Sequence, residues 1–511
     1  MTDWTSGYVA DIDYTHGYYP ELNPLRMRLA LLHAGLRPPA VDTACELGFG
    51  QGLSVNLHAA ATLTRWFGTD FNPAQAAFAQ ELAEGADAGA RLFDEAFAEF
   101  CRRDDLPDFD FIGLHGIWSW ISDENRACLV DFLRRKLKVG GVLYVSYNTQ
   151  PGWGAMVPMR DLLVDHAEVL GADGSGIVNR IDGALAFAAR LLEAEPAYAR
   201  ANPQIADRLA RMREQDRHYL AHEYFNRDWQ PMRFAAMAEW LNGAKLGYAC
   251  SAHPLDAIDA LNLTATQQQL LAEIPDSVFR QTARDFCVNQ QFRRDYWVKG
   301  ARRLDPLEQL ELLRAQQVVL VQPREAVALQ VRGSLGEAQL QEALYAPVLD
   351  ILGDHQPRTL GQLEQQWGDA RPGFAQLLEV VMVLAGQGAV MAAQDPRGSG
   401  KIRQRTDRLN TQLLRRARSG SAINYLASPV TGGGILVPRF QQLFLLARRH
   451  GHRQPAQWAQ FAWSLLSSQG QRILRDGQAL ESAEENLSEL TAQAERFAER
   501  QLAVCEALQL T

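Results

Sequence analysis

Three evenly spaced glycines form the clearest candidate for a ligand-binding loop. Gly48, Gly50 and Gly52 follow a stretch that reads as a buried strand and precede one that reads as a helix. Such a loop brings backbone N–H groups and the positive end of a helix to an anionic or carboxylate-bearing ligand, at a distance that a Cβ would block. Dinucleotide-binding loops prefer the spacing G-x-G-x-x-G, so the even spacing favours S-adenosylmethionine (AdoMet) over NAD. We expect Glu46 and Phe49 of the same segment to take part in binding AdoMet.

Acidic side chains end the next two expected strands. Asp70 ends the strand at 66–69, where a carboxylate can accept hydrogen bonds from both ribose hydroxyls of the ligand. Capping the following helix is the alternative role for this residue. Phe71 comes next and is expected to contact the same ligand. Asp94 ends the strand at 91–93, where it can reach the adenine amino group, and helix capping is the alternative there too.

Aromatic and polar side chains follow the fourth and fifth expected strands. His115 and Trp118 belong to the run HGIWSW, which we expect beside the ligand crevice unless its two tryptophans form a packed core pair. Tyr147 at the end of the fifth strand and Asn148 directly after it are expected to orient a methyl acceptor. The alternative for Tyr147 is packing under the loop. We expect Tyr14 and Trp118 to form walls of the acceptor pocket.

Methyl transfer from a sulfonium is an in-line displacement, so the protein mainly aligns the nucleophile with the methyl group and removes water. An amine acceptor must first lose a proton, and His222 with its neighbour Glu223 is a candidate pair to accept it. A buried or surface pair without a chemical role is the alternative. The six cysteines are scattered and contain no CxxC pair, so we expect neither a metal site nor a disulfide framework.

The elements that must position these residues alternate along the first part of the chain. Helical patterns separate five short strands, which we expect at 40–47, 66–69, 91–93, 109–114 and 142–147. This alternation predicts a parallel, doubly wound sheet that binds ligands at the carboxyl ends of its strands. We therefore expect an α/β fold with a Rossmann-like class I methyltransferase domain over residues 1–155.

Two further domains are expected after this one. Stretches rich in Ala, Leu, Arg and Gln predict a mostly helical middle domain over residues 156–302, and residues 303–511 form a C-terminal domain. Within the latter, a helix, turn, helix and short strand near 340–395 indicate a winged-helix-like segment. Residues 401–418 contain seven basic side chains and one acidic one, which would suit RNA but is more typical of a solvated helix face.

The length, charge and composition of the chain limit the kinds of partner that we expect. A chain of 511 residues exceeds one compact core, and its net charge of −9 gives no overall attraction to phosphate backbones. Nucleic acid is therefore not an expected partner. The N-terminus has no Lys or Arg before Arg26, and no apolar run of about 20 residues occurs, so we expect a cytoplasmic protein without membrane insertion. A homodimer is compatible with the sequence.

Several segments, taken in order, resemble bacterial class I methyltransferases that carry a methyltransferase regulatory domain. The more specific ones are HGIWSW at 115–120 and SYNTQPGW at 146–153, and the resemblance continues in HYLAHEY at 218–224 and QFRRD at 291–295. It covers most of the chain. The sequence departs from the family at Phe49, where the family usually has cysteine, and in the loosely matching run 14–20.

Characterised members of that family include protein-lysine methyltransferases that act on bacterial surface proteins. The resemblance therefore implies an AdoMet-dependent enzyme with a protein substrate, a lysine acceptor and a regulatory middle domain. Two other hypotheses stay open at this point. The chain could methylate a small molecule or RNA, or it could be a non-catalytic sensor that binds AdoMet and contacts partners through its winged-helix-like segment.

Overall fold

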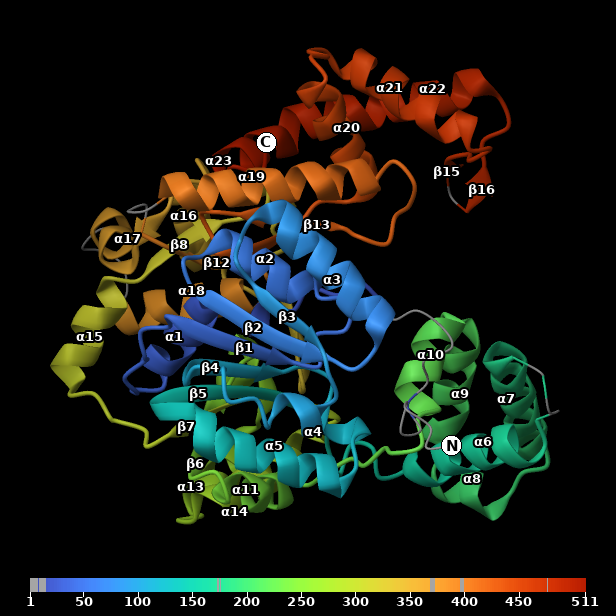
Figure 1. Cartoon of the computed structure of the whole chain (residues 1–511). Coiled ribbons are helices and arrows are strands. Elements are labelled where there is room, and N and C mark those ends of the chain that lie inside the picture. Colours follow the sequence, from blue (N-terminus) through green and yellow to red (C-terminus); the bar gives the residue numbers. More distant parts are fainter. Residues whose placement is uncertain are drawn as a thin grey trace.

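The computed structural model describes residue 8 and residues 15–171, 174, 176–367, 373–395, 399–475 and 477–511. Its centre is a seven-stranded sheet with the order β3-β2-β1-β4-β5-β7-β6 (Figure 1). The strands are β1 Thr43–Leu47, β2 Arg65–Asp70, β3 Arg91–Asp94, β4 Phe109–Leu114, β5 Leu137–Asn148, β6 Leu246–Ser251 and β7 Phe292–Lys299. Only β7 runs antiparallel to its neighbours in this sheet. The predicted Rossmann-like α/β fold is confirmed.

The last two strands of this sheet lie beyond the boundary that we predicted at residue 155. β6 and β7 come from the segment expected to be a helical middle domain, and they complete the sheet next to β5. The predicted domain boundary at residue 155 is therefore wrong, because it divides the strands of one sheet between two domains. The error has a physical reason: β7 carries Arg293, Arg294 and Asp295, so it lacks the apolar pattern of a buried strand. Arg293 pairs with Asp295 of the same strand and with Asp285, and Arg294 pairs with Glu21.

Helices cover both faces of the sheet. One face carries α1 Pro24–His33, α2 Leu53–Ala61 and α3 Pro73–Ala86, whose apolar side chains share a core with C-terminal residues. The other face carries α4 Phe97–Phe100, α5 Asp123–Lys136, α11 Phe234–Asn242 and α14 Ser277–Val288. Two short helices, α12 Asp259–Asn262 and α13 Ala265–Ala272, precede α14. Both faces are covered, as a largely parallel sheet requires.

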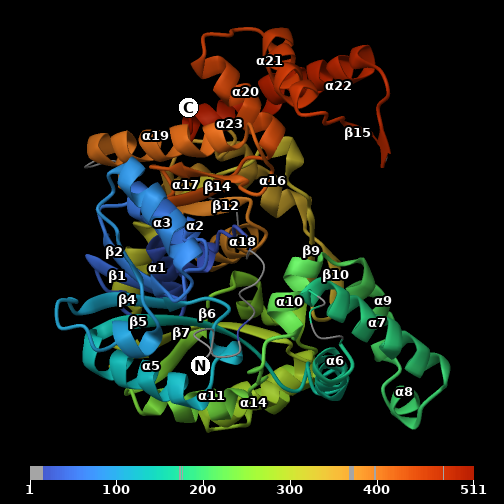
Figure 2. The same cartoon turned by 45° about the vertical axis from the view of Figure 1, so that its right-hand side comes forward.

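A lobe of five helices lies beside the sheet and is green in Figures 1 and 2. It consists of α6 Val157–Val169, α7 Ile177–Glu193, α8 Ala197–Ala201, α9 Gln204–Glu214 and α10 Arg217–Tyr224. The lobe has an apolar core of its own, which includes the buried side chains of Met159, Leu163, Ile181, Leu185 and Leu209. This part of the predicted middle domain is helical, as expected.

The C-terminal part begins with α15 Pro306–Arg314 and a three-stranded antiparallel sheet of β8 Gln317–Leu320, β11 Arg358–Thr359 and β12 Val390–Ala393. A hairpin of β9 Gln330–Gly333 and β10 Gly336–Gln339 and the helix α16 Glu342–Ile351 follow β8. The expected order of helix, helix and strand is present as α17 Leu360–Trp367, α18 Phe374–Gly386 and β12. The winged-helix assignment itself stays a prediction.

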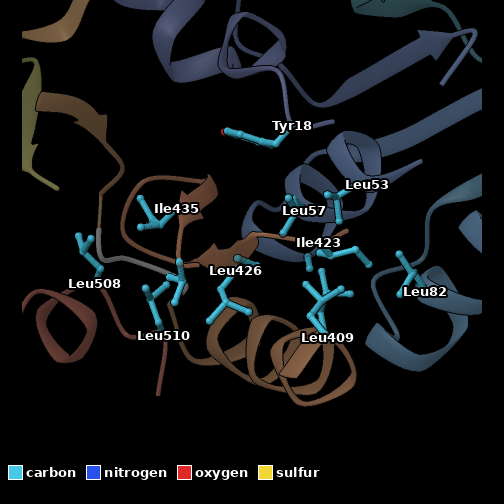
Figure 3. Packing of buried hydrophobic residues seen from close by; sticks show 14 of the residues in the cluster. Tyr18, Leu53, Leu57, Leu82, Leu409, Ile423, Leu426, Ile435, Leu508 and Leu510 are labelled. Atoms are coloured by element: carbon cyan, nitrogen blue, oxygen red, sulfur yellow. The ribbon is translucent and has the colours of Figure 1, made fainter. Parts of the chain in front are cut away.

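The basic stretch at 401–418 lies mainly in α19 Ser399–Arg416, which packs on α2 and α3. Arg408 pairs with Asp87 at 2.7 Å, and Arg416 pairs with Glu81 at 2.7 Å. The side of the helix that meets the first domain is also apolar: Figure 3 shows Leu409 among side chains of α2, α3 and β13 Tyr425–Ser428. Part of the basic surface that would suit RNA is therefore engaged in contacts with the first domain.

The chain closes with one further hairpin strand, β14 Gly433–Leu436, and a helical layer above α19. That layer contains α20 Arg439–Arg449, α21 Pro455–Ser468, α22 Ala483–Arg496 and α23 Leu502–Ala507, with the short hairpin β15 Leu474–Arg475 and β16 Gln478–Ala479. Among the residues that the structure describes, no helix has both the length and the apolar character needed to cross a membrane.

Candidate active site

A cavity of about 610 Å³ opens at the carboxyl ends of β1, β2 and β4. The glycine loop after β1 forms one wall, and the segments after β2, β3 and β4 form others. The remaining walls come from the N-terminal segment, the start of α5 and the residues after α10. Ligands are expected at this edge of a doubly wound sheet, so the cavity is the candidate active site.

The glycine loop needs its glycines for backbone conformation and for space. Gly48, Gly50 and Gly52 have φ values of +71°, +58° and +68°, in the left-handed region that L side chains rarely adopt. A Cβ on Gly48 would lie 2.4 Å from Ile117 Cδ1, and one on Gly52 would lie 2.4 Å from Ala79 Cβ. All three glycines line the cavity, where they expose backbone to whatever occupies it.

Phe49, the departure from the family pattern, lies in the same loop and is 5% exposed. Its ring packs on β2, where a Cβ on Gly68 would come within 2.9 Å of Phe49 Cδ1. A phenylalanine therefore fits this loop because the neighbouring strand provides a glycine opposite it. Phe49 also lines the cavity.

Asp70 holds the glycine loop from the end of β2. Its carboxylate accepts a hydrogen bond from the Gly50 N–H at 2.8 Å and another from the Asn72 N–H at 3.0 Å. Burial raises the pKa of Asp70 to about 6, against the lowering effect of these two bonds. The helix-capping alternative for Asp70 is wrong, because the Asn72 side chain caps α3. Asp70 lines the cavity, with oxygen lone pairs left for ligand hydroxyls.

Glu46 lies beneath the loop and is not among the residues that line the cavity. Its side chain is buried, and its Oε2 accepts no hydrogen bond from the described residues. Burial, and then the nearby charge of Asp70, raise the pKa of Glu46 to about 8. The carboxyl group is therefore mostly protonated at neutral pH until a positive charge comes near it.

His115 and Phe71, both predicted at the site, line the cavity. Tyr19 stacks on the His115 ring at a centroid distance of 3.6 Å, and His115 Nδ1 lies 2.8 Å from the Tyr144 hydroxyl. Burial lowers the pKa of His115 to about 4, so this histidine is neutral at pH 7. The Phe71 ring meets Tyr8 edge-on at 5.6 Å, which places Tyr8 over the same wall.

The two tryptophans of the HGIWSW run point to different places. Trp118 is 1% exposed and packs edge-on against Trp240 at 6.2 Å, in the core under the sheet. Trp118 is therefore not a wall of the cavity, contrary to our prediction. Trp120 takes that position, and its indole N–H donates to the Glu223 carbonyl at 3.3 Å, which joins the cavity to the helical lobe.

Tyr147 and Asn148 end β5 with their side chains on opposite faces of the sheet. Tyr147 is fully buried, and its hydroxyl donates to Asp295 at 2.9 Å on the face away from the cavity. The structure does not bring Tyr147 to the cavity, which corrects the role that we expected for it. Asn148 lies on the same face of β5 as Tyr144 and Ser146, and its buried Nδ2 donates no hydrogen bond to the described residues.

Two other predicted residues, His222 and Asp94, lie outside the cavity wall. His222 is buried behind Tyr8, at a ring distance of 5.6 Å, and does not line the cavity. Burial raises the pKa of its neighbour Glu223 to about 7. Asp94 is exposed at the end of β3, whereas the next three residues, 95–97, line the cavity. Tyr14 lies outside the described residues.

Sequence reasoning missed several residues of the cavity wall. Tyr8 and Tyr19 come from the N-terminal segment, and Arg227 and Asp228 follow α10. Only the abundance of tyrosine before residue 20 could have drawn attention to that segment. Within the described part of the chain, no group of three or more His, Cys, Asp or Glu side chains is placed to hold a metal ion.

Known proteins resemble this chain both in sequence and in fold. A family model described as "Predicted methyltransferase regulatory domain" matches residues 216–299. A protein of Synechocystis sp., sll1526, is 39% identical over 499 residues, which cover 97% of each chain. The solved structure of PKMT2 from Rickettsia typhi in complex with AdoHcy is similar with a TM-score of 0.69 and 17% identity, covering 98% of this chain and all of that one. At this identity, the likeness to PKMT2 shows a common fold.

Proposed function

We propose that this chain, which belongs to the class I methyltransferases that carry a methyltransferase regulatory domain, transfers methyl groups from AdoMet to lysine side chains of a protein. One observation carries the proposal. The left-handed glycine loop and Asp70, which holds that loop, line one cavity of about 610 Å³ at the carboxyl ends of the strands. The full-length fold of PKMT2, solved with S-adenosylhomocysteine (AdoHcy), supports the same cofactor.

The cavity walls fit AdoMet. The loop at 48–52 leaves space where Cβ atoms would otherwise stand, as close approach to a carboxylate-bearing ligand requires. We assign the ribose hydroxyls to Asp70 and the adenine to the side of the cavity between Phe71 and the segment 95–97. That segment replaces Asp94 as the expected adenine contact. AdoMet, when bound, supplies the methyl group on its sulfonium.

An amine acceptor fits the other walls. Tyr19 and Trp120 present aromatic surface, and three carboxylates lie at the same cavity. Asp123 pairs with Arg126 at 2.6 Å and Asp228 with Arg227 at 3.6 Å, whereas no ion pair is recorded for Glu124 among the described residues. Carboxylates attract a lysine ammonium, and loss of water around the bound side chain then favours its neutral form, which carries the attacking lone pair. These walls favour a basic side chain of a protein over a phosphate-rich acceptor such as RNA.

The acceptor proton needs a group that can take it near neutral pH. We assign this role to Glu223, which lies behind the lining residues: its charge acts on Tyr8 of the cavity wall, and burial raises its pKa to about 7. Its backbone is tied to Trp120 in the cavity wall by the hydrogen bond to the indole. Asn148, which was also expected to orient the amine, is buried and does not line the cavity, so we assign it no contact with the acceptor.

Transfer of label tests the proposal. Tritiated AdoMet would be incubated with the protein and a bacterial lysate, and label would be counted in polypeptide, RNA and small solutes. We expect label in polypeptide for the wild type, a loss of at least about tenfold for Asp70→Asn, and no loss for Asp104→Asn, an exposed carboxylate outside the cavity. Label that enters only RNA or small solutes, or no fraction at all, contradicts the proposal.

A further inference from the structure

Two of the six cysteines, Cys101 and Cys128, lie together behind the wall of the active-site cavity. Cys101 directly follows α4, and Cys128 belongs to α5, which packs on α4 (Figure 1). Each cysteine comes one helical turn after the last cavity-lining residue of its segment, which is Ala98 in one case and Asn125 in the other. The two thiols therefore lie where two walls of the candidate active site meet.

Direct contacts hold the two side chains next to each other. A hydrogen bond links the thiols of Cys101 and Cys128. The Cys128 thiol also contacts the Phe97 carbonyl at 3.7 Å, and the Cys101 N–H donates to the same carbonyl at 2.9 Å. Cys128 is thus held against both the first and the last residue of α4. Sulfur atoms within hydrogen-bonding distance of each other can form a disulfide without a rearrangement of either helix.

The two cysteines differ in exposure and in acidity. Cys128 is partly exposed, whereas Cys101 is 1% exposed. The hydrogen bond between them lowers the pKa of Cys128 and raises that of Cys101, and the charges of Arg102 and Arg135 lower the pKa of Cys128 further. An accessible thiolate beside a second thiol is the arrangement of cysteines that react with peroxides, where the second thiol resolves the oxidised first one.

We propose that Cys128 is a site of oxidation by hydrogen peroxide and that Cys101 converts the oxidised sulfur into a disulfide between α4 and α5. The Cys128 thiolate attacks one peroxide oxygen, the O–O bond breaks, and the hydroxide that leaves takes up the proton lost from Cys128. Cys101 then attacks the sulfur of the sulfenic acid, and its own proton leaves with the hydroxyl group as water. One peroxide is reduced to two water molecules, and the two thiols lose two electrons and two protons.

The disulfide acts on the cavity through the segment 95–98. This consequence rests on the proposed function, in which residues 95–97 contact the adenine of AdoMet. A disulfide is shorter than the hydrogen bond that it replaces, so it draws Cys101 toward α5, and Ala98 in the same turn moves with it. We expect the oxidised protein to bind AdoHcy at least about threefold more weakly than the reduced protein, because one wall is displaced from the ligand.

Peptide mapping of the full-length protein after treatment with hydrogen peroxide and alkylation of the remaining thiols tests the site. We expect trypsin to release peptide 92–102 linked to peptide 127–134. Cys287→Ser, which removes another partly exposed cysteine, on α14, should give the same linked pair. Cys128→Ser should give none. In Cys101→Ser, oxidation should stop at the sulfenic acid of Cys128, which dimedone traps.

The absence of the linked pair overturns the proposal. A link from Cys101 to Cys45, a buried cysteine whose charge acts on Cys101, does so too, as does a Cys101→Ser protein without a dimedone adduct. The circular dichroism spectra of the reduced variants, expected to match that of the wild type, separate these results from misfolding.

Calorimetric titration with AdoHcy tests the consequence for the cavity. The weaker binding of the oxidised wild type should be restored by a phosphine reductant and should not occur in peroxide-treated Cys128→Ser. Equal affinity of the oxidised and reduced wild type contradicts the displacement of the wall. A reduced wild type that does not bind AdoHcy contradicts the proposed cofactor, whereas the linked peptides report on the disulfide alone.

Discussion

Replacing Glu46 by glutamine should remove most of the pH dependence of cofactor affinity. The carboxyl group of Glu46 is buried under the glycine loop with a pKa of about 8, so it is largely protonated in the free protein at neutral pH. An AdoHcy molecule held at the glycine loop would bring its ammonium charge near Glu46 and favour the ionised form. Binding then releases a proton, and affinity rises with pH until the pKa of the free protein is passed.

The size of the effect follows from that pKa. With a value of about 8, roughly 3% of the free protein has Glu46 ionised at pH 6.5 and half of it at pH 8. The affinity for AdoHcy should therefore rise about 15-fold over this range. Asp70, with a pKa of about 6, is already mostly ionised at pH 6.5 and adds a factor of less than two.

Isothermal titration calorimetry with AdoHcy at pH 6.5, 7, 7.5 and 8 measures this dependence. Buffers of different ionisation enthalpy give the proton count, which should be about 0.9 released per ligand at pH 7 for the wild type. Glu46→Gln should show less than a twofold change over the range, whereas Glu84→Gln, an exposed position on α3, should behave like the wild type. A flat wild-type profile, or the same slope in Glu46→Gln, refutes the reasoning.

Three further predictions concern stability and rate. Gly52→Ala should lower the free energy of unfolding by about 1–3 kcal/mol in urea titrations, because its Cβ meets α3 at a left-handed φ; a stability equal to the wild type would contradict this. Tyr147→Phe should cost about 1–3 kcal/mol through the lost bond to buried Asp295, yet change the transfer rate less than twofold. Glu223→Gln should slow transfer at pH 7 about 100-fold without weakening AdoHcy binding, and Glu214→Gln should not.

The parts of the fold that follow local rules could be predicted from the sequence. Apolar runs bounded by glycine and proline residues predict the first five strands. The glycine loop and Asp70 come at the ends of two of these strands, where a nucleotide-like ligand binds. β6 and β7 could not be found in this way. Arg293 and Asp295 of β7 can be buried because Asp285 on α14 and Tyr147 on the distant β5 provide their partners.

The residues on the acceptor side of the cavity could not be predicted in this way, because the sequence does not say which face of its element each side chain takes. Trp118 and Trp120 are two residues apart in a short turn of 3₁₀ helix, so the sequence does not say which one faces the cavity. Along β5, alternation puts Tyr147 and Asn148 on opposite faces, but the face that meets the cavity is set by the contact of Tyr144 with His115. Tyr8 reaches the site from the N-terminal segment without any local pattern.

The most direct test of protein-lysine methylation is amino-acid analysis of the labelled product. Polypeptide labelled from tritiated AdoMet by the wild-type protein would be hydrolysed in acid, and the label would be separated against methylated amino-acid standards. We predict that the label elutes with Nε-methylated lysine and falls at least about tenfold when Asp70→Asn replaces the wild type. Label in methylated arginine, label released as volatile methanol from carboxyl esters, or unlabelled polypeptide would contradict the proposed function.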